Sequence, residues 1–410
     1  MSDRSKRSPT QQLYFLTFLH TVIDSYATLL PHLLPVLLAR LAAETAARYT
    51  LAGALISVYN FFSALNQIFF GWLEDRVRSI HFLTFGVACT AFCLSLLNTA
   101  PSIWIVFLLL IAGGTGVAAF HPLGTVQAAS LAKQSQGFGV SIFLTGGNLG
   151  RAAGPLLIML FLVRYGWNKL VWCMIPGLLL AFLVPKVLEL RYPKAPSPEI
   201  NHPTLQSKMR RALWESIRPS LRPLFALYLI AVLRTLAMIG LENFLSLFLD
   251  ERGYSNVARS AVLALFLLAG TVGIVVGGSL SHRISRHRML LFSLIASPPL
   301  LYLSLHSSGA VFLTLLFLGN VILSASTSVN IVWAQQLLPE RENIASSLMM
   351  GGAWGVGGVL SIPVGMLGDR FGLANVLDCL TVLPLVAAVL VVFLRGGTTG
   401  DAHGDEFSEG

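Results

Sequence analysis

Residues 113–155 read GGTGVAAFHPLGTVQAASLAKQSQGFGVSIFLTGGNLGRAAGP. Two apolar, glycine-rich segments flank a short polar segment in this stretch. In the second of them Gly146, Gly150 and Gly154 recur every four residues, so a helix there has one nearly bare face. Inside a membrane, small residues on one face let a second helix approach closely, and Pro155 removes a backbone hydrogen-bond donor beside them. The stretch therefore predicts closely packed membrane-spanning helices.

The composition extends this prediction to the whole chain. Of its 410 residues, 55% are hydrophobic and only 11% are charged, and the mean hydropathy is +0.72. Soluble domains carry about 25% charged residues. Apolar runs of about 20 residues, long enough to cross the hydrocarbon of a bilayer, recur from end to end. A polar, basic start followed by a full-length span argues against a cleavable signal peptide.

We therefore expect an all-α membrane protein with twelve transmembrane helices in two pseudo-symmetric six-helix bundles. The predicted spans are about 12–40, 50–72, 80–98, 102–131, 136–162, 169–187, 221–249, 256–281, 289–306, 309–335, 343–367 and 373–394.

The charge distribution predicts the orientation of these spans. The formal net charge is +9, which could indicate a nucleic-acid partner, but 19 of the 28 Lys and Arg residues fall in the termini and the even-numbered connections. Seven fall on the opposite side. Basic residues accumulate on the cytoplasmic side of membrane proteins. Both termini are therefore predicted to be cytoplasmic, and the charge reports topology rather than nucleic-acid binding.

An internal repeat supports the division into two bundles, because separated segments match one another at offsets of 206 or 207 residues. The predicted domains are a cytoplasmic N-terminus (1–11), an N-terminal bundle (12–187), a cytoplasmic linker (188–220), a C-terminal bundle (221–394) and a disordered cytoplasmic tail (395–410). The matching segments are 71–82 with 278–289, 128–143 with 334–349, 164–167 with 370–373 and Cys173 with Cys379.

Two six-helix halves joined by a basic linker resemble the major facilitator superfamily. The signature loop of that superfamily matches Gly71, Leu73, Asp75 and Arg76. The resemblance implies that Asp75 and Arg76 hold the inner ends of the two halves together. In the second copy of the loop His282 stands where the acid would be. The gating residues implied by the resemblance are Gly71, Asp75, Arg76, Gly278 and Arg283.

Longer segments resemble the fosmidomycin-resistance branch of the superfamily. These segments are 20–41, 114–122, 148–158 and 334–358. The glycine stripe and Pro155 also resemble the antiporter motif of drug-exporting members. The resemblance implies proton-coupled drug efflux across a bacterial inner membrane by alternating access. The sequence departs from the branch at Leu123, where an acidic residue often follows the His-Pro pair.

Three titratable residues within the spans are candidates for proton coupling. His20 and Asp24 are four residues apart, so on a helix they share one face. Ionisable residues inside a membrane are costly and commonly functional. His121 precedes Pro122 in the middle of the fourth span and can relay a proton. The alternatives are a static His20–Asp24 hydrogen bond and a helix kink stabilised by His121.

Two embedded arginines are candidates for binding an anionic substrate, because a guanidinium pairs well with carboxylate or phosphate. The alternative is a salt bridge of Arg151 or Arg234 with Asp24 or Glu242. Asp369 and Arg370 are expected to form a local ion pair. The predicted substrate-binding residues are Arg151, Arg234, Tyr26, Asn148 and Glu242.

The sequence also excludes several functions. It has no GxxxxGK[ST] motif, so ATP is not expected to drive the protein. We expect no enzyme activity, no cofactor, no metal and no nucleic-acid partner, and we expect a monomer in the lipid bilayer. The predicted function is proton-coupled efflux of a small organic compound, anionic or amphipathic. The alternatives are a proton-coupled importer or facilitator of an anionic metabolite, and a non-transporting sensor or scaffold.

Overall fold

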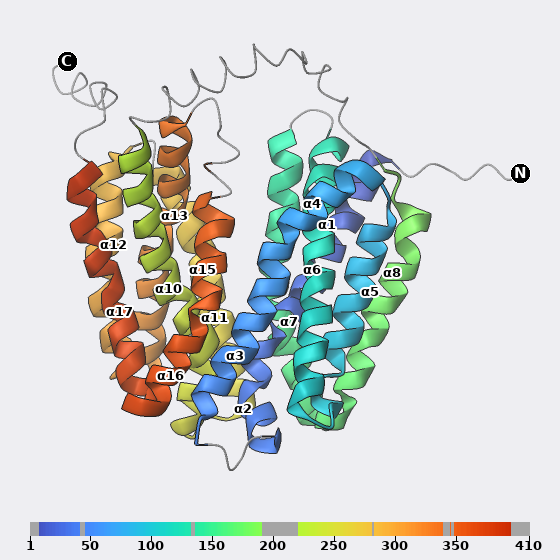
Figure 1. Cartoon of the computed structure of the whole chain (residues 1–410), viewed down its shortest axis with the longest axis horizontal. Helices are drawn as coiled ribbons and strands as arrows, with labels where there is room; N and C mark the ends of the chain where they lie inside the picture. Colours follow the sequence, from blue (N-terminus) through green and yellow to red (C-terminus); the bar gives the residue numbers. More distant parts are fainter. Residues whose placement is uncertain are drawn as a thin grey trace, which may run out of the picture. The chain divides into compact units, whose positions relative to one another are not determined.

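The computed structural model describes residues 8–41, 46–132, 136–190, 220–280, 283–338, 345 and 348–394. These residues are helical, and they contain no strand (Figure 1). Residues 1–7 of the predicted N-terminal segment, most of the linker and the tail lie outside the described residues. Within the described residues, eleven helical stretches are long and apolar enough to cross a membrane, close to the predicted bounds. They are Pro9–Leu41, Arg48–Glu74, His81–Thr99, Ile103–Leu131, Gly139–Tyr165, Trp167–Val187, Leu221–Glu251, Asn256–Leu280, Arg286–Leu305, Gly309–Leu337 and Leu373–Leu390.

The chain divides into two compact units, and each contains segments from both halves of the sequence. The first comprises residues 1–194, 240–268 and 358–376, and the second comprises 195–239, 269–357 and 377–410. The division into bundles at 12–187 and 221–394 therefore stays a prediction.

Packed helices from the first half of the chain form the core of the first unit. Within it α1 packs along α7 and α6, and α5 packs along α6 and α8 (Figure 1). Leu16, Leu19, Ile23, Phe120 and Phe143 are fully buried at these contacts. The helices are α1 (Pro9–Ala27), α5 (His81–Ser95), α6 (Ile103–Leu131), α7 (Gln136–Tyr165) and α8 (Met174–Val187).

Two of the predicted spans are interrupted in this unit. The first predicted span is divided at Thr28 into α1 and α2 (Leu29–Leu41). The helix is interrupted there because Pro31 has no N–H to donate to the carbonyl one turn earlier. The second consists of α3 (Arg48–Asn60), the π-helical turn η1 (Phe61–Leu65) and α4 (Asn66–Val77). The short 3-10 segments η2 (Leu97–Thr99) and η3 (Trp167–Cys173) flank neighbouring spans.

The glycine stripe on α7 packs against α1. A Cβ added at Gly150 would lie 2.1 Å from the Thr21 carbonyl oxygen, and one added at Gly154 would lie 2.1 Å from the Ser25 side chain. Real Cβ atoms do not approach other atoms so closely, so only glycine permits this helix spacing. The three stripe glycines face, in order, Thr17, Thr21 and Ser25 of α1.

A second close contact joins α3 to α16 (Ser361–Phe371), also within the first unit. Asp369 accepts hydrogen bonds from the backbone N–H groups of Tyr49 and Thr50, both at 2.8 Å, and from the Thr50 hydroxyl at 2.6 Å. Its carboxylate therefore caps the first turn of α3, where exposed N–H groups and the helix dipole favour a negative charge. The expected local ion pair with Arg370 was wrong, because adjacent residues on a helix do not face each other; the Arg370 guanidinium lies 5.3 Å from the ring centroid of Phe371 instead.

Asp369→Ala is expected to lower the free energy of unfolding by about 1 kcal/mol, the usual cost of losing a helix cap. The measurement is the melting temperature of the detergent-solubilised protein. Arg370→Ala is the matched control, since it removes the neighbouring charge and leaves the cap intact. Equal destabilisation by the two substitutions would contradict the capping role.

The second unit contains α12 (Arg286–Leu305) packed along α13 (Gly309–Leu337). Its core includes Leu227, Ile230, Leu290, Leu294 and Trp333. Parts of α10 (Leu221–Glu251), α11 (Asn256–Leu280) and α17 (Leu373–Leu390), together with η7 (Val391–Leu394), complete it. The predicted span at 343–367 is divided into η6 (Leu348–Gly352), α15 (Ala353–Val359) and α16.

Candidate functional site

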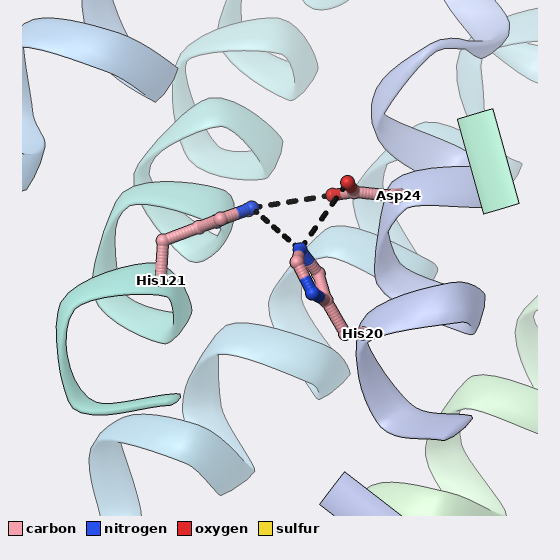
Figure 2. A group of neighbouring side chains, drawn as sticks. All are labelled: His20, Asp24 and His121. Carbon is pink, nitrogen blue, oxygen red and sulfur yellow. Dashed lines mark hydrogen bonds and ion pairs between the residues drawn. The ribbon is translucent and has the colours of Figure 1, made fainter. Parts of the chain in front are cut away.

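The three predicted proton-coupling residues meet within the first unit (Figure 2). His20 and Asp24 lie one turn apart on α1, and His121 reaches them from α6. His20 Nε2 is 3.3 Å from Asp24 Oδ2, and His121 Nε2 is 3.3 Å from Asp24 Oδ1. The two Nε2 atoms are also 3.3 Å apart. Both α1 residues are buried, with exposed fractions of 2% for His20 and 7% for Asp24.

Backbone carbonyls determine which ring nitrogens carry hydrogen. The Nδ1–H of His20 donates to the Phe143 carbonyl at 2.7 Å, and the Nδ1–H of His121 donates to the Val117 carbonyl at 2.9 Å. A neutral imidazole has only one N–H, so in the neutral form each Nε2 bears a bare lone pair. Two such lone pairs would then face each other and the Asp24 carboxylate, which is unfavourable away from water. The arrangement of these acceptor atoms can therefore accommodate an additional proton or another cation.

Two residues that the sequence analysis missed shape this cluster. A Cβ at Gly147 would lie 2.5 Å from His20 Nε2 and 2.8 Å from Asp24 Oδ2, so only glycine leaves room for the cluster. The ring of Phe143 stacks on His20 with centroids 3.9 Å apart, while its carbonyl fixes the ring orientation. Gly147 follows Gly146 but is off the four-residue stripe. That extra glycine was the available signal for a second close contact.

The same atoms suit a transition-metal ion. The ligand atoms of His20, Asp24 and His121 lie within 4.8 Å of one another. Imidazole nitrogens and carboxylate oxygens are zinc ligands, and ligating histidines commonly donate their other N–H to a carbonyl. The geometry is therefore compatible with either a metal ion or a proton bound at this cluster.

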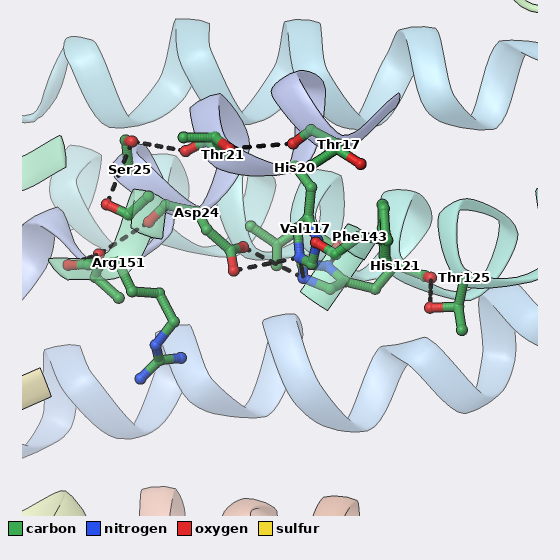
Figure 3. A network of polar contacts seen from close by, with 12 residues as sticks. Thr17, His20, Thr21, Asp24, Ser25, Val117, His121, Thr125, Phe143 and Arg151 are labelled. Atoms are coloured by element: carbon green, nitrogen blue, oxygen red, sulfur yellow. Dashed lines mark hydrogen bonds and ion pairs between the residues drawn. The ribbon is translucent and has the colours of Figure 1, made fainter. Parts of the chain in front are cut away.

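Polar contacts continue along α1 towards Arg151 of α7 (Figure 3). The Ser25 hydroxyl donates to the Thr21 carbonyl at 2.6 Å, and the Thr28 hydroxyl donates to the Asp24 carbonyl at 2.8 Å. The guanidinium of Arg151 forms an ion pair with Glu242, with 2.9 Å between Arg151 Nη2 and Glu242 Oε1. The side chain of Arg151 is 27% exposed and that of Glu242 is 10% exposed. Of the salt bridges proposed from the sequence, the structure therefore contains Arg151 with Glu242.

The other predicted substrate-binding residues make different contacts. Arg234 is buried in the second unit beside the Thr327 hydroxyl. The Tyr26 hydroxyl donates to the Cys173 carbonyl at 2.5 Å, so its polar end bonds the backbone of another helical segment. Asn148 is half-buried on α7.

The described predicted gating residues lie on α4 and at the end of α11. Arg76 is exposed, and its guanidinium lies 3.7 Å from the ring centroid of Trp72. A Cβ at Gly71 would lie 3.8 Å from Pro122 Cβ, which is ordinary contact. Gly278 is similarly open, with Ser328 Oγ 3.6 Å from a Cβ added there, and Arg283 is exposed. The side chain of Asp75 and all of His282 lie outside the described residues, so the ion pairing of this gate stays a prediction.

The helical architecture agrees with a comparison with known families. The sequence model of the Major Facilitator Superfamily matches residues 13–362. The chain belongs to the major facilitator superfamily. It is thus an integral, multi-pass membrane transporter by family and fold, and it is not an enzyme.

Two bacterial superfamily proteins resemble the chain over nearly its whole length. The fosmidomycin resistance protein of Escherichia coli is 27% identical over 383 residues, which cover 92% of this chain and 90% of that protein. The MFS-type transporter YfnC of Bacillus subtilis is 26% identical over 395 residues, which cover 94% of each chain.

Solved structures of superfamily members share the fold at lower identity. A bacterial homologue of the human lysosomal transporter Spinster, in an inward-facing and occupied conformation, matches with a TM-score of 0.77 and 15% identity. The match covers 95% of this chain and 97% of that one. The nucleoside transporter NupG matches with a TM-score of 0.69 and 16% identity, covering 96% and 100% of the respective chains. The all-helical fold predicted from the sequence is thereby confirmed.

Proposed function

We propose that this protein is a secondary active transporter that exports a small organic compound, anionic or amphipathic, in exchange for protons. It would do so by alternating access in a bacterial inner membrane, with both termini in the cytoplasm. The observation that carries the proposal is the cluster of His20, Asp24 and His121, in which His20 and Asp24 are buried and the His121 side chain is 21% exposed. Titratable groups held together inside a membrane protein commonly mark proton pathways. The resemblance to the fosmidomycin resistance protein favours export.

In this proposal the cluster binds and releases one proton. A proton held on Nε2 of either histidine is shared with the Asp24 carboxylate, because all three pairwise distances are 3.3 Å. Release of that proton leaves Asp24 facing two lone pairs, so the deprotonated cluster favours rebinding a cation. Coupling follows if the protonated cluster and the substrate-loaded protein exclude each other, since a ligand shifts a conformational equilibrium only by its differential affinity.

The experiment uses purified protein in vesicles that contain a pH-sensitive dye. Fosmidomycin is the first probe, followed by a panel of organic anions, each loaded inside before the outside is acidified. Export in exchange for protons predicts substrate efflux together with acidification of the lumen, and a protonophore should abolish the coupling. Substrate that moves in the same direction as protons would indicate the importer instead.

Two further outcomes separate the remaining alternatives. Saturable binding of a probe without any flux would indicate the sensor or scaffold. Loss of flux after treatment with EDTA, with recovery on adding Zn²⁺, would show that the cluster holds a metal ion rather than a proton. Retention of flux in EDTA is the result that we expect.

A further inference from the structure

Arg234 lies in the middle of a membrane-spanning helix. It occupies the central part of α10 (Leu221–Glu251), about 20 Å from the start and about 25 Å from the end at about 1.5 Å of rise per residue. Only 2% of its surface is exposed. A phospholipid headgroup at the membrane surface does not reach this depth, so a neutralising anion would have to come from elsewhere.

The partners of Arg234 are hydroxyl groups. Its Nη1 donates to the Thr327 hydroxyl on α13, and its Nη2 lies 3.5 Å from the hydroxyl of the adjacent Thr235. Other arginines of the described chain have carboxylate partners. Arg151 pairs with Glu242, and Arg259 pairs with Asp250.

Hydroxyl oxygens offset only part of a buried positive charge. Keeping a charged group out of water is costly unless an opposite charge and further hydrogen bonds compensate it. A guanidinium has five N–H donors in a planar fork that matches an oxyanion in two-point contact. Two of those donors are directed to threonines, so donors remain for an anionic ligand.

The neighbouring helix α13 presents a row of polar side chains near Arg234. On α13, Asn320, Ser324 and Thr327 follow at helical spacing, and Ser324 Oγ lies 3.3 Å from Asn320 Oδ1. Ser324 Oγ also lies 3.8 Å from the sulfur of Met238, one turn after Arg234 on α10. Asn320 and Ser324 are buried, whereas Thr327 is half-exposed. The polar side chains of α13 therefore extend from buried Asn320 and Ser324 to half-buried Thr327, whose hydroxyl accepts a hydrogen bond from the guanidinium.

We propose that Arg234 and Thr327 form a binding site for a singly charged oxyanion, and that a carboxylate group of the transported compound is its ligand. One buried guanidinium with hydroxyl partners neutralises one negative charge. A dianion would leave a second charge facing hydroxyl groups in a medium of low dielectric constant. The link to transport rests on the proposed function, whereas anion binding itself does not.

The test uses formate as the probe and the full-length protein in detergent. The melting temperature is measured against increasing formate, with chloride keeping the ionic strength constant and sulfate as the divalent comparison. Sulfate stabilises folded proteins non-specifically, so the informative quantity is the difference between wild type and variant. We expect saturable stabilisation by formate in the wild type, its loss in Arg234→Met, and weaker binding by about 10-fold in Arg234→Lys, which keeps the charge without the fork.

Further variants keep the test valid if Arg234→Met does not fold. Thr327→Val should weaken formate binding and leave the charge in place. Thr115→Val is the matched control, because that hydroxyl on α6 bonds only its own helix backbone at Ile111, and it should bind formate as the wild type does. The same formate dependence in the wild type, Arg234→Lys and Thr327→Val would overturn the proposal, and so would the absence of any saturable effect in the wild type.

The two proposals fail in different ways. Formate binding is measured without a membrane or a pH gradient, so a failure of proton coupling leaves it unaffected. An unchanged formate effect after lipid removal and re-addition is expected, because the site lies too deep for headgroups. Proton-driven export that persists in Arg234→Met with an unchanged KM would contradict the role of Arg234 in substrate binding, and it would leave the proposed function standing.

Discussion

Asp24→Asn is expected to abolish proton-driven transport, lowering its rate by on the order of 100-fold, the scale on which positioned proton-transfer groups act. The substitution keeps the shape of the side chain and its capacity to accept a hydrogen bond. It removes the negative charge that lies 3.3 Å from both His20 and His121 and that, in the proposed function, holds the proton. The measurement is flux in vesicles over a series of outside pH values, where the variant should show a flat profile.

Two comparisons sharpen this result. His121→Gln should retain partial coupling, because His20 and Asp24 remain 3.3 Å apart on α1. Asp378→Asn is the matched control, since that carboxylate pairs with His306 in the other compact unit. Active transport by Asp24→Asn with an unchanged pH profile would show that Asp24 is not the coupling group, whatever the family.

Glu242→Gln is expected to be the most destabilising of the proposed substitutions. It removes the carboxylate that faces Arg151 at 2.9 Å. Removing one partner of a buried ion pair costs about 3–5 kcal/mol, and the 27% exposure of Arg151 places the expected loss at the lower end, about 3 kcal/mol. The melting temperature in detergent reports the change.

A double-mutant cycle separates the ion pair from other roles of Glu242. Arg151→Gln combined with Glu242→Gln should recover much of the lost stability, because two amides can share a hydrogen bond without an uncompensated charge. If the double variant is as unstable as the sum of the single variants, the pair does not contribute as a unit. Transport that requires both charges, despite restored stability, would indicate that the pair acts during the transport cycle.

The membrane spans were largely predictable from the sequence because hydrophobicity is a local property. A run of about 20 apolar residues must be a helix in lipid, since each backbone N–H needs an internal partner. The helix α13 at Gly309–Leu337 and the helix α6 at Ile103–Leu131 accordingly agree closely with prediction. The division of the span at 343–367 was not predicted, because mean hydropathy does not report a local change of helix type.

Part of the candidate site was predictable for the same reason. An acid or a histidine in an apolar run is conspicuous without any knowledge of the fold, and the spacing of His20 and Asp24 places them on one face. Their contact with His121 was not predictable, because it depends on how α1 and α6 pack against each other. Gly147 gave a partial signal as an extra glycine beside the stripe, but the sequence does not show which residues it makes room for. Phe143 was missed because a backbone carbonyl that accepts a hydrogen bond has no signature of its own in sequence.

The sequence by itself determined the class of protein, the positions of its spans and the list of ionisable groups held within them, because each follows from the cost of placing polar groups in hydrocarbon. Tertiary structure alone decided the partners of those groups. It joined His121 to Asp24, Arg151 to Glu242 and Asp369 to the start of α3, and it left Arg234 among hydroxyls. The physical reason is that an ion pair depends on distances of a few ångströms between residues far apart in the chain. Those distances are set by how closely glycines such as Gly150 allow the helices to approach.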